Sequence, residues 1–443
     1  MPPEHEIPLE ALPSGVPASH KHLPPALWAV LVLPFGLTVG YATLTMPFVL
    51  KARGFDMTSI GAVAFVCQLP HTLKLFWAPA LDAGWPRKRW FYAMLALNIV
   101  SLAATMLIPP SKTDHAGPFT FFSIYAVVLT VAQFAAATSS SAVLALLAID
   151  VPKEFKGRAS GWQTAGNLVG TFAGGAALIA CIVHLGNVAT ALVVVLVLAL
   201  SAIPAMILVE PTPKKHVLRK LMGDLLGDVW ALIRSRPGWT GLIICLSPVG
   251  TGALLNLASA LVTDYEPEPH RREHLAVVVT GVAGGLINGA GSLVGGYLCD
   301  LMNRRVAYML FGGVTALVAV GMLLAPATPS AFTVGCLAYS FANGLCYAAF
   351  YAFVLEMIGA SAGVTTQLAI FIGASNLAIS YVTWLDGAAY DWAARFWPHH
   401  LSAGRQGLCG MDAGSTFVGI AVILVMTTMV ARWGRRPGST AAA

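Results

Sequence analysis

The hydrophobic positions of this chain fall into long runs that almost lack charge. Residues 159–209 and 306–355 contain no Asp, Glu, Lys or Arg, and each run is long enough for two helical spans of roughly 20 residues. Strands of a membrane barrel would instead alternate over about 10 residues. We therefore predict α-helical spans, with each of these two runs folded as two spans joined by a tight turn.

The same criterion, applied to the whole chain, predicts an all-α integral membrane protein with twelve transmembrane helices. The expected spans are about 26–50, 57–81, 90–109, 118–148, 159–183, 187–209, 239–263, 275–299, 306–325, 330–357, 361–385 and 412–431. Similar motifs almost half a chain apart indicate two pseudo-symmetric six-helix halves. The expected domains are a tail at 1–25, halves at 26–209 and 239–432, a linker at 210–238 and a tail at 433–443.

The linker carries an amphipathic pattern. Its apolar residues recur at helical spacing, with cations between them. We predict a helix that lies on the inner leaflet and joins the halves, and an ordinary solvated linker helix is the alternative. The apolar residues are Val217, Leu218, Leu221, Met222, Leu225, Leu226, Val229 and Ile233.

Composition and charge agree with a membrane location. The chain is 57% hydrophobic and 10% charged, whereas a soluble domain carries about 25% charged residues. Of the 26 lysines and arginines, eighteen lie in segments on the side of the N-terminus, seven lie on the other side, and Lys74 lies inside a span. The positive-inside rule therefore predicts that both termini are cytoplasmic. The Ala- and Gly-rich composition suggests a bacterial inner membrane.

Glycines recur every four residues in two predicted spans. Such spacing lines one helix face with glycine and lets another helix approach closely. We expect each face to be a packing surface, or a sliding surface between the halves. The glycines are Gly166, Gly170 and Gly174 in span five, and Gly281, Gly285 and Gly289 in span eight.

Two charged motifs mark places where spans two and eight leave the membrane. Asp82 is followed by Arg87, Lys88 and Arg89, and Asp300 is followed by Arg304 and Arg305. The two motifs resemble the loop 2–3 and loop 8–9 motif of the major facilitator superfamily. That resemblance implies that Asp82 with Arg87, and Asp300 with Arg304, form gating clamps between neighbouring helix ends. The alternative is that these charges only anchor the topology.

Two charged residues are candidates for coupling. Lys74 lies some seven residues, roughly 10 Å, inside span two, where it either faces the interior and needs a partner or snorkels to the headgroups. Glu356 is the only acid that we expect deep in the second half, where it either binds a proton or marks a helix end. Asp386 and Asp391 are assigned to a long loop at about 386–411.

Uncharged polar residues inside the spans are candidate substrate contacts. Taken singly, each is also explained by a hydrogen bond between helices. Together they could line a polar cavity. Those we select for substrate binding are Tyr41, Gln133, Asn256, Tyr347, Tyr351 and Gln367.

Several classes of function lack their signatures. No Gly-x-x-x-x-Gly-Lys-Ser/Thr loop occurs, so we expect no nucleotide hydrolysis. The seven cysteines show no paired spacing, and His-Glu-x-x-His is absent, so we expect no metal and no cofactor. A Gly-x-Ser-x-Gly match at 359–363 falls in a short turn without a preceding strand, so we expect no enzyme. The net charge of +6 follows the topology and indicates no nucleic-acid partner.

The stretch from Lys74 to Asp82, Lys-Leu-Phe-Trp-Ala-Pro-Ala-Leu-Asp, resembles the signature of the peptide/acetyl-coenzyme A transporter branch of the major facilitator superfamily, which includes the AmpG-like muropeptide permeases. In that branch Lys74, Trp77 and Asp82 match motif residues, and Thr366 and Gln367 match a Thr-Gln pair. Span four departs from the pattern, because Ser139–Ser141 stand where AmpG-like members carry acids.

The resemblance implies a permease whose halves rock around a central site lined by spans one, four, seven and ten. We predict a secondary active transporter of a small anionic or zwitterionic solute, such as a muropeptide, a peptide-like molecule or a carboxylate, coupled to protons. The alternative is a membrane sensor that binds a ligand on a transporter scaffold without moving it.

Overall fold

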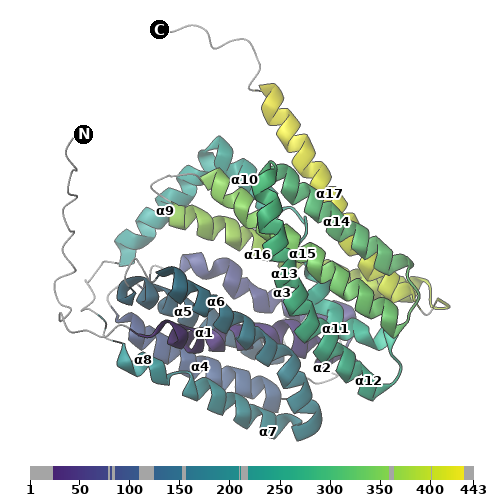
Figure 1. The fold of residues 1–443 in the computed structure, drawn as a ribbon, viewed down its shortest axis with the longest axis horizontal. Coiled ribbons are helices and arrows are strands. Elements are labelled where there is room, and N and C mark those ends of the chain that lie inside the picture. The colour runs from purple at the N-terminus through teal and green to yellow at the C-terminus, as the bar shows by residue number, and fades with distance from the viewer. Residues whose placement is uncertain are drawn as a thin grey trace.

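The computed structural model describes residues 23–77, 80–81, 85–108, 124–151, 156–208, 210, 218–358, 364–400 and 402–433. Within these ranges the regular structure is entirely helical (Figure 1). Asp82 and the hydrolase-like turn at 359–363 lie outside the described residues.

The first half of the fold runs from the N-terminus to α8, and the second half from α10 to α17. The first half contains α1 (Pro25–Gly40), η1 (Tyr41–Thr45), α2 (Met46–Ala52), α3 (Met57–Leu73), η2 (Lys74–Phe76), α4 (Arg87–Leu107), α5 (Ile124–Asp150), α6 (Lys156–Phe172), η7 (Ala173–Ala177), α7 (Leu178–Leu200) and α8 (Ile203–Ile207). Helix α9 (Leu218–Arg234) follows as the linker. The second half contains α10 (Arg236–Leu246), α11 (Ala253–Tyr265), α12 (Pro269–His274), η8 (Leu275–Ala283), α13 (Gly284–Leu301), α14 (Arg304–Leu324), α15 (Pro329–Ile358), α16 (Val364–Phe396) and α17 (Ala403–Trp433).

The described helices make twelve passes. Eight segments are long and apolar enough to span a membrane, and one of them, Ala165–Ile207, contains two passes because the chain reverses at Gly186 with φ +78°. The remaining passes are α3, the pair α10 and α11, and α16. This confirms the predicted fold class. Because the number of passes is even, Leu23 and Trp433 lie on the same side of the membrane. We call this side the termini face and the other side the opposite face.

The predicted loop at about 386–411 is wrong. Helix α16 continues to Phe396 and α17 begins at Ala403, so Asp386 and Asp391 are helical. Asp386 is buried inside the protein, and Asp391 accepts hydrogen bonds from the start of α3. Neither aspartate therefore has to leave the membrane and end the span. Helix α9 covers most of the expected linker at 210–238, and its place on the inner leaflet stays a prediction.

The glycine face of span five is a packing surface, as predicted. A Cβ atom built on Gly166 would lie 2.1 Å from the carbonyl oxygen of Ala29, and one on Gly170 would lie 2.5 Å from that of Leu33. Both glycines therefore let α6 rest directly against the backbone of α1.

The glycines of span eight behave differently. Only Gly281 meets a neighbour, while a Cβ atom on Gly285 or Gly289 would have no atom within 4 Å. Helix α13 packs closely through other glycines, because Cβ atoms on Gly291 and Gly295 would approach the backbone of α15 to 2.2 and 2.7 Å. The prediction that this stripe packs against a neighbour is thus wrong for Gly285 and Gly289. Helix α13 packs instead through Gly291 and Gly295, further along the helix.

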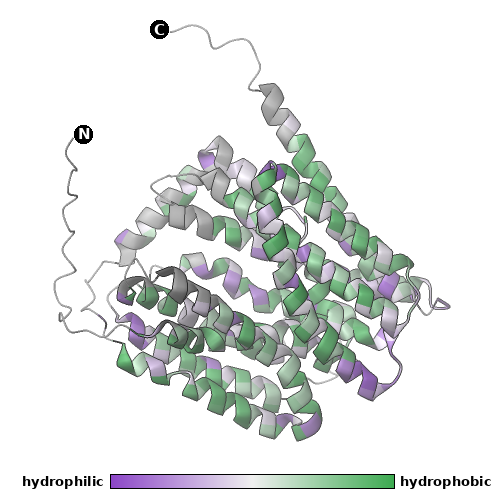
Figure 2. Cartoon of the chain, viewed as in Figure 1, coloured by the Kyte–Doolittle hydropathy of each residue, from purple (hydrophilic) through white to green (hydrophobic). Residues whose placement is uncertain are grey.

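The two halves meet mainly through a few elements of each half. Helix α3 lies against α16, η1 and α2 lie against α11, and η7 lies against η8. In Figure 1 the purple-to-teal helices of the first half and the green-to-yellow helices of the second form two groups side by side. Figure 2 shows hydrophobic colour along most of their length and a hydrophilic α12. The elements that join the halves also surround the candidate site.

Candidate functional site

A cavity of about 450 Å³ lies between the halves. It is bounded by η1 and α6 from the first half and by α11, η8, α13 and α15 from the second. Its volume suits a small molecule. None of the lining side chains that the structure describes is ionisable, and the polar ones are Thr43, Thr171, Asn256, Thr280, Asn288 and Ser340.

Irregular helix geometry creates this space. The segments η1, η7 and η8 are π-helical, and such turns often occur at functional sites. Span seven is interrupted at residues 247–252, where Gly250 and Gly252 have φ of +55° and +70°. Tyr308 donates to the carbonyl of Val249, at 3.0 Å, so that the interrupted backbone is satisfied inside the protein. Discontinuous helices at mid-membrane are typical of transporter binding sites.

Among the six residues selected for substrate binding, Asn256 is the one that lines this cavity. Its amide Nδ2 donates to Thr383 Oγ1 at 3.0 Å, which fixes the side chain beside α16. The oxygen of the amide is not used in this bond. Asn256 therefore has the position and the spare acceptor that a solute contact needs, and its role in binding stays a prediction.

Tyr41 and Gln133 lie inside the first half. The Tyr41 and Tyr125 hydroxyls are 3.0 Å apart. Gln133 donates to the carbonyl of Thr38 at 3.0 Å and lies 2.8 Å from Nε2 of His71. These bonds join η1, α1 and α3 to α5 rather than face the cavity, and they correspond to the alternative of hydrogen bonds between helices.

The other three selected residues are separate from the cavity lining. Tyr347 is half-buried beside the interrupted segment of span seven. Tyr351 is 43% exposed on the next turn of α15. The side chain of Gln367 lies outside what the structure describes. Their substrate contacts stay predictions.

The two coupling candidates lie at the ends of helices. Lys74 opens η2 directly after α3, and its side chain is half-buried. Three residues on, the Trp77 indole donates to Thr138 Oγ1 at 3.1 Å, which ties this turn to α5. Glu356 lies in the last turn of α15, and its side chain is outside the described part.

The first gating motif contacts an acid that the sequence analysis did not consider. Glu210 accepts hydrogen bonds from the backbone N–H groups of Arg87 and Lys88, at 2.8 and 2.9 Å, and its carboxylate lies 4.0 Å from the Arg87 guanidinium. Glu210 thus joins the end of span six to the start of α4 on the termini face. Arg304 opens α14, and the side chain of Asp300 is not described.

The opposite face is closed by polar contacts between the halves. Asp391 of α16 accepts hydrogen bonds from the Met57 and Thr58 N–H groups at the start of α3. Tyr390 donates to Asp264 at 2.9 Å, while the Lys51 ammonium lies 4.6 Å from the centre of the Tyr390 ring.

Two more bonds support this closure. Ser259 of α11 donates to the carbonyl of Leu44 in η1 at 2.8 Å. His184 and Glu273, from the first and second halves, lie 3.0 Å apart. The two halves are therefore held together at this face.

The second half also buries two carboxylates that the sequence analysis missed. Asp386 of α16 and Asp412 of α17 are 0% and 1% exposed. The expectation that Glu356 is the only deep acid in this half is thus wrong. A usable signal was present, because Ala388, Ala389 and Trp392 continue the apolar pattern past Asp386 and argue against a loop.

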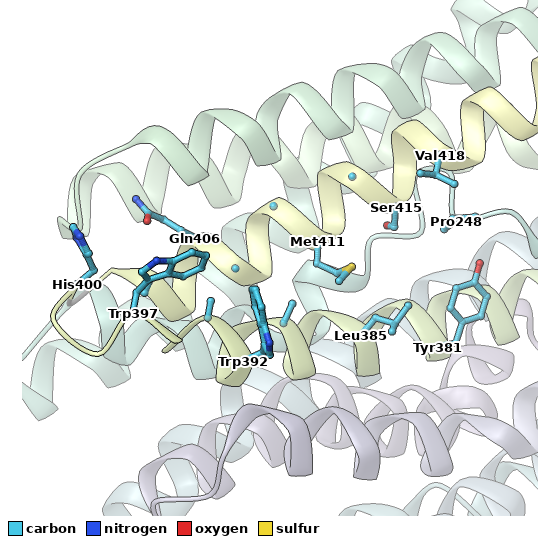
Figure 3. A pocket seen from close by; sticks show the side chains of 16 residues that line it. Pro248, Tyr381, Leu385, Trp392, Trp397, His400, Gln406, Met411, Ser415 and Val418 are labelled. Atoms are coloured by element: carbon cyan, nitrogen blue, oxygen red, sulfur yellow. The ribbon is translucent and has the colours of Figure 1, made fainter. Parts of the chain in front are cut away.

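A larger cavity, of about 810 Å³, lies between α16 and α17 (Figure 3). Its lining includes Leu385, Trp392, Met411 and Val418, of which Trp392 and Val418 are well exposed. This groove belongs to the outer surface of the second half alone, so a movement between the halves would not alternate its access. The smaller cavity between the halves is the better candidate for a transport site.

Comparisons with known proteins agree with this architecture. The chain is similar in fold to the nucleoside transporter NupG (TM-score 0.68, 13% identity, 91% of this chain and 98% of that chain). It is also similar to a D-xylose–proton symporter (0.60, 14%, 91% and 95%) and to the peptide transporter POT (0.67, 9%, 92% and 95%). The profile of the Major Facilitator Superfamily matches residues 26–383, more than half of the chain. The chain is thus a multi-pass membrane transporter, not an enzyme, and it belongs to the major facilitator superfamily.

Proposed function

We propose that this protein is a secondary active transporter that carries a small solute by alternating access through the cavity between its halves. The observation that carries this proposal is the position of the cavity. It is bounded by both halves, and these are held together at the opposite face by the contacts of Asp391, Tyr390 and Ser259. A rocking motion that breaks these contacts would present the same cavity to the other side.

The finer aspects of the proposal concern the solute and its energy source. We expect coupling to protons, with Lys74 and Glu356 as charged participants. The described cavity lining is mostly apolar, with six polar side chains and no charged one, so an anionic or zwitterionic solute would depend on Lys74 for its counter-charge. The AmpG-like resemblance favours a muropeptide or peptide-like solute, while the transporters of similar fold act on a nucleoside, D-xylose or peptides.

The proposed orientation places both termini in the cytoplasm of a bacterial inner membrane. The closed opposite face would then be the external one, and the solute would reach the cavity from the cytoplasm in this state. The clamps of Asp82 with Arg87 and of Asp300 with Arg304 would form and break on the cytoplasmic side as the halves rock.

The test is uptake into proteoliposomes. The panel contains peptides, anhydro-muropeptides, coenzyme A thioesters, small carboxylates, nucleosides and pentoses, each with and without an inward proton gradient. We expect gradient-dependent uptake of one class, and its loss in Lys74→Ala if that solute is anionic. Binding of a ligand without flux would overturn transport in favour of the sensor alternative. Equal uptake with and without the proton gradient would overturn proton coupling.

A further inference from the structure

Two carboxylates lie together in the interior of the second half. Asp386 and Asp412 lie on the contacting helices α16 and α17, close enough to interact electrostatically. Within the described residues, neither oxygen of Asp386 has a hydrogen-bond partner, and Oδ1 of Asp412 has none. The amide oxygen of Asn343 on α15 is also buried without a partner. Buried acceptors without donors are costly, so the unpartnered oxygens of Asp386 and Asp412 would be stabilised by a positive or donating ligand.

The two acids have different surroundings. Asp412 accepts a hydrogen bond from the Tyr339 hydroxyl at 2.8 Å and another from the backbone N–H of Leu254. Leu254 lies in the first turn of α11, where free N–H groups and the helix dipole stabilise a negative charge. Asp386 receives no such donor from the described residues. A charge is therefore much better supported on Asp412 than on Asp386.

Like charges held together in a low-dielectric interior cannot both persist, and a single shared proton removes the repulsion. We propose that Asp386 and Asp412 form a proton-binding site, in which Asp386 carries the proton and Asp412 carries the charge. The ligand of this site is the proton itself.

The other ionisable groups near the pair do not replace this proton. Tyr339 already donates to Asp412, and Cys409 lies between Asp412 and Arg405 on α17. The guanidinium of Arg405 donates to the carbonyls of Met322 and Ala325, both at 2.9 Å, and to the hydroxyl of Tyr265 at 3.3 Å. Asp264 on α11 and Tyr390 on α16 are bonded to each other. None of these contacts brings a positive charge onto Asp386.

The position of the pair connects it with the closure of the opposite face, and this step rests on the proposed function. Asp386 lies about one helical turn before Tyr390 and Asp391, the residues of α16 that join the halves. Opening this face would move that part of α16 and admit water to the pair. The proton would then exchange with the opposite side of the membrane, and closure would trap it.

The first experiment needs no transported solute. Infrared spectra of the purified full chain are recorded across a pH series, with the carbonyl stretch of a protonated carboxyl group as the readout. We expect the signal in the wild type at neutral pH, its loss in Asp386→Asn and its retention in Asp412→Asn. Asp391→Asn, on the same helix, is the control and should retain it.

Absence of the signal from the wild type at neutral pH, or its full persistence in Asp386→Asn, would overturn the site. Loss of the signal on adding Na⁺ at constant pH would assign the site to a metal cation and would also overturn it. Melting curves of the variants establish whether they are folded. If Asp386→Asn does not fold, the infrared signal of Asp412→Asn still tests the site, because its loss there would contradict a proton on Asp386.

The second experiment measures uptake and counterflow in proteoliposomes. One coupled proton and a gradient of one pH unit support about tenfold accumulation of a neutral solute. We expect Asp386→Asn to abolish this accumulation while solute exchange continues. Accumulation unchanged in Asp386→Asn would refute the link to transport. An infrared signal that behaves as expected in a protein that moves no solute would refute the proposed function and leave the proton site standing.

Discussion

Three carboxylates of this protein end up at the start of a helix to which they do not belong. Glu210 accepts from the first N–H groups of α4, Asp391 from those of α3, and Asp412 from Leu254 in α11. The first N–H groups of a helix have no partner within it, and a membrane interior offers no water to satisfy them. Each acid therefore joins two segments that are distant in sequence.

Glu210→Gln should destabilise the protein by about 0.5–2 kcal/mol, because the amide keeps one acceptor but loses the charge that favours the helix start. The measurement is thermal or denaturant unfolding of the purified protein. Glu268→Gln is the matched control, since its pairing with Arg271 at 3.0 Å is exposed and should matter by less than about 0.5 kcal/mol. Equal effects of both substitutions would contradict this account of Glu210.

At the residue scale, the sequence indicated which residues take part in contacts more reliably than it indicated the residues they contact. It singled out Arg87 but not Glu210, because a contact between the start of α4 and the end of span six depends on how two loops meet. It placed Asp386 outside the membrane because an acid near the end of an apolar run usually marks that end. The bonds that make such an acid tolerable come from other helices, and one sequence does not show them.

Glycine spacing has two different outcomes at the scale of elements. In α6 it produces direct backbone contact with α1, whereas in α13 Gly285 borders the cavity and Gly289 has open space around it. Spacing determines which residues share a helix face, and it does so reliably. What that face meets depends on the neighbouring helices, which explains why the prediction was right for one span and wrong for the other.

Two alanine substitutions should therefore change stability in opposite directions. Gly170→Ala should cost about 1–3 kcal/mol, since its Cβ would overlap the backbone of α1, which can yield only by moving a helix. Gly289→Ala should stabilise by about 0.5–1 kcal/mol, because alanine favours a helix and finds free space. Unfolding measurements on both variants test this, and the same sign for both would contradict the assignment of the two faces.

For the whole molecule, the twelve passes follow from local properties. Run length and charge placement predict spans because each span must bury its own backbone polar groups in lipid. The cavity is not a local property. It depends on the π-helical segments η1 and η8 that line it and on which faces of the two halves meet. The sequence therefore identified Asn256 within a longer set without separating it from residues such as Gln133.

The closure of the opposite face should depend on Asp391. Replacing it by alanine removes two hydrogen bonds between the halves. The closed state would lose about 1–2 kcal/mol, which changes the ratio of closed to open states by a factor of roughly 5–30. Spin labels on the exposed positions Val188 and His270 would report this change as a longer distance between the halves. Glu210→Gln, which acts on the termini face of the first half, should leave that distance unchanged. A distance unaffected by Asp391→Ala would show that other contacts hold the face shut.

The most direct test of the central claim is to fill the cavity between the halves and measure uptake. Gly285 borders that cavity and has open space around it, so Gly285→Phe adds volume there without disturbing the packing of α13. Gly321 has the same open surroundings on the exposed side of α14, which makes Gly321→Phe the matched control. With equal amounts of folded protein in proteoliposomes, we predict that Gly285→Phe loses solute uptake and that Gly321→Phe retains it. Normal uptake by Gly285→Phe would contradict the claim that the solute passes through this cavity.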